Sequence, residues 1–177
     1  MTEERTLSSQ LVFGGHAVRL RVDTVLTTDG RQTTREIVDP GDCIAVVALD
    51  DNDNVLLVSQ YRKAIEKELL EIPAGGIDLG ETPEETVIRE MQEETGYRPG
   101  RVERLAGFYS TPGFCTEYLH LYLATELTPS RLTAEDTAGI SLARIPLAEI
   151  DGMLDDGAFE DAKSIAGLRT LLDRRRP

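Results

Sequence analysis

The sequence predicts an α/β fold, in which a mixed β-sheet is sandwiched between α-helices and a small antiparallel sheet precedes it. Residues 43–49, CIAVVAL, form a continuous apolar run, which is typical of a strand that is buried on both faces. Residues 83–95 have the apolar spacing of an amphipathic helix. Residues 9–38 show the alternation of antiparallel strands on either side of Asp29-Gly30, a pair that favours a hairpin turn.

The chain is expected to have two parts. Residues 1–38 are predicted to form the antiparallel strands, although the polar residues 1–9 are expected to be loose. Residues 39–177 are predicted to form the main domain. With 177 residues, of which 40% are hydrophobic and 29% are charged, the chain can bury a substantial core.

Turn residues divide the main domain into shorter elements. Strands are expected at residues 43–49, 55–60, 68–72, 102–110, 118–124 and 140–145. Helices are expected at residues 83–95, 147–154 and 161–174. The segment 129–141 between the last two strands is polar and acidic, so we expect a loop there.

The overall charge restricts the possible partners. A net charge of −13 argues against nucleic acid, because phosphate binding needs clustered Lys and Arg. An anionic substrate would therefore need a local exception, such as a metal cluster. No apolar run approaches the ~18 residues of a membrane span and no signal peptide is visible, so we expect no membrane association and a cytoplasmic protein. Cys43 and Cys115 have no metal or redox spacing.

The helix at residues 83–95 has clear ends and an unusual acidic face. Thr82 and Glu85 can form a capping box, and Gly96 can close the helix in a left-handed conformation. Glu90, Glu93 and Glu94 fall within an arc of roughly 100°. Such crowding is unfavourable in a packed helix unless a cation compensates for it, and carboxylates suit Mg²⁺ or Mn²⁺. The alternative is a solvated acidic face.

The stretch from Gly75 to Tyr97, GGIDLGETPEETVIREMQEETGY, resembles the Nudix box. This box is the signature of hydrolases that cleave nucleoside diphosphates linked to another group, and every fixed position of it is filled. The resemblance implies the Nudix fold and two or three Mg²⁺ or Mn²⁺ ions held against a pyrophosphate. The implied metal ligands are Glu90, Glu94 and the backbone carbonyl of Ala74.

The resemblance also implies catalytic roles. Arg89 would orient a glutamate, with Glu81 as a supporting residue, and Glu93 would be a further ligand or a base. In ADP-ribose pyrophosphatases a glutamate from a later loop, often in an E-x-E pattern, acts as general base. Glu135 fits the first acid, whereas Thr137 replaces the second, so the base remains open between Glu135, Asp136 and Glu93.

Flanking residues resemble the ADP-ribose pyrophosphatases in particular. Pro112 lies sixteen residues beyond Gly96, and residues 161–166, DAKSIA, resemble a helix motif of these enzymes. The resemblance implies a homodimer formed through residues 1–38. It also implies a group of substrate-binding residues, namely Arg35, Glu36, Arg62, Gly113, Phe114 and Glu117.

Some of these roles have structural alternatives. Phe114 is equally consistent with a core position. The guanidinium of Arg62 is suited to a phosphate or a carboxylate. Glu71 is expected either to contact the substrate or to be a buried, paired acid.

The expected reaction is Mg²⁺-dependent hydrolysis of the pyrophosphate bond of ADP-ribose to AMP and ribose 5-phosphate. One alternative is a hydrolase of another nucleoside diphosphate sugar, such as GDP-mannose. The other is a non-catalytic sensor that binds ADP-ribose. The complete set of Glu90, Glu93 and Glu94 argues for turnover, because a sensor would tolerate the loss of these acids.

Overall fold

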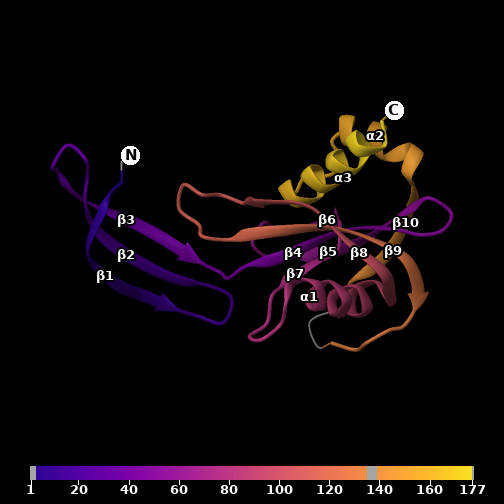
Figure 1. Ribbon diagram of the computed structural model, residues 1–177, viewed down its shortest axis with the longest axis horizontal. Coiled ribbons are helices and arrows are strands. Elements are labelled where there is room, and N and C mark those ends of the chain that lie inside the picture. Colours follow the sequence, from indigo (N-terminus) through magenta and orange to yellow (C-terminus); the bar gives the residue numbers. More distant parts are fainter. Residues whose placement is uncertain (1–2, 135–138, 177) are drawn as a thin grey trace. The chain divides into compact units, whose positions relative to one another are not determined.

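The computed structural model describes residues 3–134 and 139–176 (Figure 1). Glu135, Asp136 and Thr137, which bear on the choice of the base, lie outside the described residues. The chain forms two compact units. The first comprises Met1–Asp42 and Tyr109–Tyr118, and the second comprises Cys43–Phe108 and Leu119–Pro177.

The first unit contains a three-stranded antiparallel sheet in the order β1-β2-β3. Its strands are β1 (Arg5–Gly14), β2 (Arg19–Leu26) and β3 (Gln32–Asp39). Gly30 has φ +83° in the turn between β2 and β3, as the Asp-Gly pair predicts. The expectation that residues 1–9 are loose is wrong from Arg5 onward, because this polar stretch pairs with β2, beginning with Arg5 opposite Leu26.

The second unit is built on a mixed sheet, which confirms the predicted sheet type. Its main path is β10-β5-β4-β9-β8, with β6 paired to β5 and β7 to β4. β4 runs parallel to β9, whereas β5 is antiparallel to both β4 and β10. The strands are β4 (Cys43–Leu49), β5 (Asn54–Arg62), β6 (Lys67–Glu71), β7 (Ala74–Gly76), β8 (Tyr97–Tyr109), β9 (Tyr118–Pro129) and β10 (Ser141–Pro146).

Helices cover both faces of this sheet (Figure 1). On one face, Ile44 and Val46 of β4 pack with Val87 of α1 (Pro83–Glu90). On the other face, Ala45 and Val47 share a core with α2 (Leu147–Asp155) and α3 (Ala162–Arg175). Successive residues of a strand point to opposite faces, so a fully apolar β4 serves two cores. The described helices include none long and apolar enough to cross a membrane.

The helix of the acidic stretch differs from its prediction at one end. The capping box is present, since the Thr82 N–H donates to Glu85 Oε2 at 2.8 Å and the Glu85 N–H to Thr82 Oγ1 at 3.3 Å. Gly96 has φ +80° and closes the helix, as predicted. However, Met91–Thr95 form a π-helical turn, not the end of a uniform α-helix. The Thr95 hydroxyl donates to the Met91 carbonyl, four residues back, and this competition with backbone bonding favours a wider turn.

Candidate active site

Arg89 lies at the centre of a cluster of acids from α1, the loop before it and the π-helical turn after it. Its Nε donates to Glu81 Oε1 at 2.9 Å, and its Nη1 donates to Glu90 Oε1 at 2.7 Å and to Glu93 Oε2 at 3.2 Å. Nη2 donates to Glu81 Oε2 at 3.0 Å and to the Gly76 carbonyl at 3.0 Å. One guanidinium therefore orients three carboxylates and connects them to the backbone at the end of β7.

This arrangement shifts the pKa values of both Arg89 and Glu81 so that each residue stays charged. The bidentate hydrogen bond from Arg89 lowers the pKa of Glu81 to about 2. The same hydrogen bonds, opposed by partial burial, raise the pKa of Arg89 above its usual range. Both groups are charged across the physiological range, so Arg89 is a fixed cation beside Glu90 and Glu93.

Glu94 lies in a different environment from the other acids. It is only 8% exposed, and its Oε2 accepts the backbone N–H of Ala74 at 3.1 Å. Burial, followed by the nearby charge of Glu90, raises the pKa of Glu94 to about 8. Without a cation the two carboxylates oppose each other, and Glu94 holds a proton at neutral pH.

Glycine is required where the backbone passes these acids. A Cβ on Gly75 would lie 1.9 Å from Glu90 Oε1, so no larger residue fits without displacing Glu90. Ala74 and Gly75 belong to β7, which pairs with Ala45 and Ile44 of β4. The central sheet therefore sets the position of the backbone that faces Glu90 and Glu94.

A second charged cluster forms around Glu71 at the end of β6. Arg62 forks onto it, with Nε donating to Oε1 at 2.9 Å and Nη2 to Oε2 at 2.6 Å. The Lys163 Nζ also donates to Glu71 Oε2, and to Asp161 Oδ1 at 2.9 Å. Burial by itself would raise the pKa of Glu71, but Arg62 and Lys163 hold it below its ordinary value. Glu71 is thus the buried, paired acid of the two alternatives.

The first unit gathers four of the predicted substrate-binding residues around one hollow of about 330 Å³. These residues are Arg35, Glu36, Gly113 and Phe114. Phe114 is 54% exposed, which excludes the core position considered for it. Glu117 does not line this hollow, and its backbone carbonyl accepts the N–H of Ser110 at 3.2 Å.

The family of the chain follows from a match of residues 39–168 to the model of the NUDIX domain. The chain belongs to the Nudix family. It is 35% identical to "Methanol dehydrogenase activator" of Bacillus methanolicus and 32% identical to "ADP-ribose pyrophosphatase" of Bacillus subtilis. Both alignments cover 96% of this chain and 92% of the relative. "GDP-mannose pyrophosphatase" of Yersinia enterocolitica is 33% identical, over 76% of this chain and 75% of the relative.

The same fold occurs in a solved structure titled "Crystal structure of ADP compounds hydrolase". The TM-score is 0.90 at 22% sequence identity, over 98% of this chain and 95% of the other. At that identity the similarity establishes the fold alone, and it confirms the prediction of a Nudix fold.

The Nudix site has donors that fit a hard divalent cation. The carboxylates of Glu90 and Glu94 meet the backbone of Ala74 and Gly75. Burial and then the charge of Glu90 raise the pKa of Glu94, and a cation would offset both effects. No group of three His, Cys, Asp or Glu residues within 3–134 and 139–176 forms a ready-made metal site. Mg²⁺ commonly binds one or two carboxylates and takes its other ligands from water and substrate phosphates.

Lys163 and Asp161 belong to the charged cluster around Glu71, which the sequence did not predict. The signal was present in the DAKSIA motif, but nothing in the local pattern links Lys163 to a carboxylate 92 residues away. Arg21 was also missed, although it lines the same hollow as Arg35 and Glu36.

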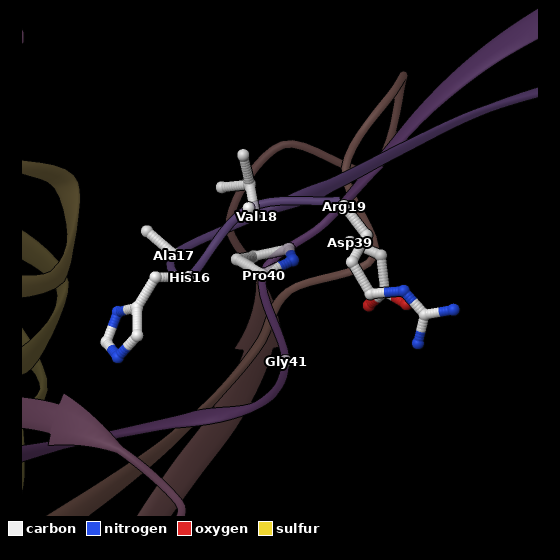
Figure 2. Close-up of a pocket in the computed structure, with 8 residues that line it drawn as sticks. His16, Ala17, Val18, Arg19, Asp39, Pro40 and Gly41 are labelled. Carbon is white, nitrogen blue, oxygen red and sulfur yellow. The ribbon is translucent and has the colours of Figure 1, made fainter. Parts of the chain in front are cut away.

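Another hollow, of about 250 Å³, is formed by residues 15–19 and 39–41 of the first unit (Figure 2). Arg19 and Asp39 lie together there, while the His16 side chain points away from them (Figure 2). The hollow contains none of the predicted site residues.

Proposed function

We propose that this Nudix protein hydrolyses the pyrophosphate bond of ADP-ribose with Mg²⁺ or Mn²⁺, giving AMP and ribose 5-phosphate. The observation that carries the proposal is the placement of Glu90 and Glu94 against the β7 backbone, with Arg89 holding the surrounding acids. The relative named ADP-ribose pyrophosphatase, which aligns over 96% of the chain, supports this substrate.

In this proposal Glu90, Glu94 and the Ala74 carbonyl hold the metal ions. When bound, such ions neutralise phosphate charge and lower the pKa of a coordinated water. Glu93, oriented by Arg89 at 3.2 Å, is placed to accept or direct a proton of the attacking water. Glu135 and Asp136 remain the alternative bases.

We assign substrate recognition to two groups of residues. Arg62 would bind a phosphate, because its side chain is 40% exposed although its guanidinium is anchored on Glu71. Arg35, Glu36, Gly113 and Phe114 would hold the adenosine end, where the exposed ring of Phe114 offers a stacking surface for a base. Glu117 would contribute from the same loop.

The test is product analysis with the purified protein. ADP-ribose with Mg²⁺ or Mn²⁺ should give AMP and ribose 5-phosphate in equal amounts, and EDTA should stop the reaction. Glu94→Gln should lower kcat by on the order of 10³-fold. Glu103→Gln, which changes an exposed acid paired with Arg174, serves as control and should leave kcat unchanged. Parental kcat in Glu94→Gln would contradict the metal assignment.

Hydrolysis of another nucleoside diphosphate sugar is the second candidate. The relative named GDP-mannose pyrophosphatase, at 33% identity, supports this second candidate. A substrate panel with both sugars separates the two hydrolases by kcat/KM. Tight ADP-ribose binding without turnover of any substrate would instead identify a sensor.

We also propose that the protein is a cytoplasmic homodimer, formed through the strands of residues 1–38. β1 is exposed along its whole length and presents apolar side chains, among them Leu11, Val12 and Phe13 at 55–56% exposure. Light scattering after size exclusion should give the mass of a dimer. Val12→Glu should shift the protein toward the monomer, and a parental monomer at micromolar concentration would contradict the proposal.

A further inference from the structure

The start of α3 is connected to the end of β6 through Lys163. Its Nζ donates to Glu71 Oε2 and, at 2.9 Å, to Asp161 Oδ1. Asp161 is the N-cap of α3, and its Oδ1 also accepts the backbone N–H groups of Lys163 at 3.1 Å and Ser164 at 3.2 Å. The lysine is thus held from both sides, and its side chain is only 14% exposed.

Packing fixes the same helix to the chain just after Glu71. The Ser164 hydroxyl accepts the backbone N–H of Ile72 at 2.8 Å, and Ser164 is fully buried. A Cβ on Gly167 would lie 2.9 Å from Ile72 Cδ1 and 3.1 Å from Val47 Cγ2, so α3 lies as close to the sheet as glycine allows. Lys163 is therefore anchored on a rigid support.

The carboxylate of Glu71 accepts hydrogen bonds from both Lys163 and Arg62. The Glu71 side chain is 1% exposed, and Arg62 donates to both carboxylate oxygens, at 2.9 Å and 2.6 Å. Because Lys163 holds Oε2 from the other side, the carboxylate cannot turn without breaking a buried hydrogen bond. Within the described part of the chain, Nη1 of Arg62 donates no hydrogen bond, so this edge of the guanidinium remains for a ligand.

One buried oxygen atom of this cluster lacks a hydrogen bond, which lowers the stability of the fold. Asp161 Oδ2 is buried and has no hydrogen-bond partner among the described residues. A buried acceptor without a partner costs about 1–3 kcal/mol. This unsatisfied oxygen favours a role for the cluster beyond capping α3.

We propose that Lys163 is a positioning residue for substrate binding, which acts by fixing Glu71 and, through it, the orientation of the Arg62 guanidinium. The inference rests on the proposed function, in which Arg62 binds a phosphate, and it places an anionic phosphate oxygen at Nη1 of Arg62. Lys163 itself contacts no reacting group in this scheme. Its contribution is that the donor edge of Arg62 is already oriented when the substrate arrives.

The kinetic test compares two lysines that join β6 to the region of α3: Lys163 pairs with Glu71 at the end of the strand, and Lys67, at its start, pairs with Glu160. Lys163→Met removes the contact to Glu71 but leaves Arg62 to pair that carboxylate. Lys67→Met is the matched control, because it removes an exposed pair with Glu160 that does not touch Glu71. With ADP-ribose, Lys163→Met should lower kcat/KM by about 10- to 100-fold, mainly through KM. Lys163→Arg should restore most of it, and Lys67→Met should not change it.

A double-mutant cycle distinguishes positioning from a general loss of stability. Arg62→Lys keeps a cation on Glu71 but removes the fork. If Lys163 acts through that fork, Lys163→Met should lower kcat/KM by no more than about twofold in the Arg62→Lys background. An undiminished effect there, or parental kcat/KM in Lys163→Met alone, would overturn the proposal.

A measurement without substrate keeps the inference separate from the proposed function. The ¹⁵N-detected Nε–H signal of Arg62 reports its hydrogen bond to Glu71, and Arg62→Lys identifies this signal by its loss. Lys163→Met should shift or broaden the signal, whereas Lys67→Met should not. If the wild-type protein fails to cleave ADP-ribose, the proposed function fails, and the signal still tests the positioning of Arg62. An unchanged signal in Lys163→Met would refute that positioning.

Discussion

Replacement of Glu94 by glutamine should stabilise the metal-free protein at alkaline pH. Burial and the charge of Glu90 raise the pKa of Glu94 from 4.5 to about 8. Between these values the folded protein holds a proton that the unfolded chain has released, so the free energy of unfolding falls as pH rises. At about 1.36 kcal/mol per pKa unit, the loss reaches up to about 5 kcal/mol by pH 8. Glutamine stays neutral and keeps an acceptor for the Ala74 N–H.

The assay is chemical denaturation from pH 5.5 to 8.5 in EDTA, with Glu103→Gln as the control for loss of an exposed carboxylate. As pH rises, the free energy of unfolding of Glu94→Gln should increase relative to that of the control, by several kcal/mol at pH 8.5. The two curves should approach each other toward pH 5. Parallel curves across this range would refute the reasoning, because they would mean that Glu94 titrates alike in both states.

Addition of Mg²⁺ should reverse the order of the variants. Ion binding needs the charged carboxylate, so it displaces the proton of Glu94, and Mg²⁺ affinity should rise between pH 6 and pH 8. Mg²⁺ should raise the Tm of the wild-type protein at pH 8 and have a much smaller effect on Glu94→Gln. Equal stabilisation of both proteins by Mg²⁺ would show that Glu94 is not a ligand.

Three further variants test the remaining geometry. Gly75→Ala should lower kcat at least about tenfold with an unchanged circular dichroism spectrum, because its Cβ would lie 1.9 Å from Glu90 Oε1. Arg89→Lys should raise the pKa of Glu81 from about 2. The stability that this pair provides above pH 4.5 is lost as pH falls toward 2, so the wild-type advantage in acid denaturation should shrink over that interval. Gly167→Ala should reduce the free energy of unfolding by about 1–3 kcal/mol through overpacking, and an equal or higher value would contradict the close approach of α3.

Local chemistry made several features predictable. The capping box at Thr82 and Glu85 and the left-handed Gly96 depend on residues within one turn of each other. The apolar run of β4 predicted a strand with two buried faces, and helices do cover both. The strand at Arg5–Ser9 was not predictable in the same way, because polar residues there are ordered by pairing with β2.

The π turn at Met91–Thr95 shows where a periodic pattern reaches its limit. The acids of this segment fit an arc of a regular α-helix, and the sequence offered no reason to widen the last turn. The hydroxyl of Thr95 and the burial of Glu94 against Ala74 both depend on how the turn packs. Periodicity predicts which side chains share a face, whereas packing fixes the backbone geometry that presents them.

Residue types and their spacing specified the family, the acidic helix and the glycine beside it, because these features depend on neighbours along the chain. Three-dimensional packing brought Arg62 and Lys163 onto Glu71. It also raised the pKa of Glu94, while the pKa of Glu81 is lowered. These outcomes depend on burial and on contacts between residues up to 92 positions apart, and both exist only in the folded chain. A carboxylate has no fixed charge or partner in a sequence, and it acquires both from the low-dielectric surroundings that folding creates.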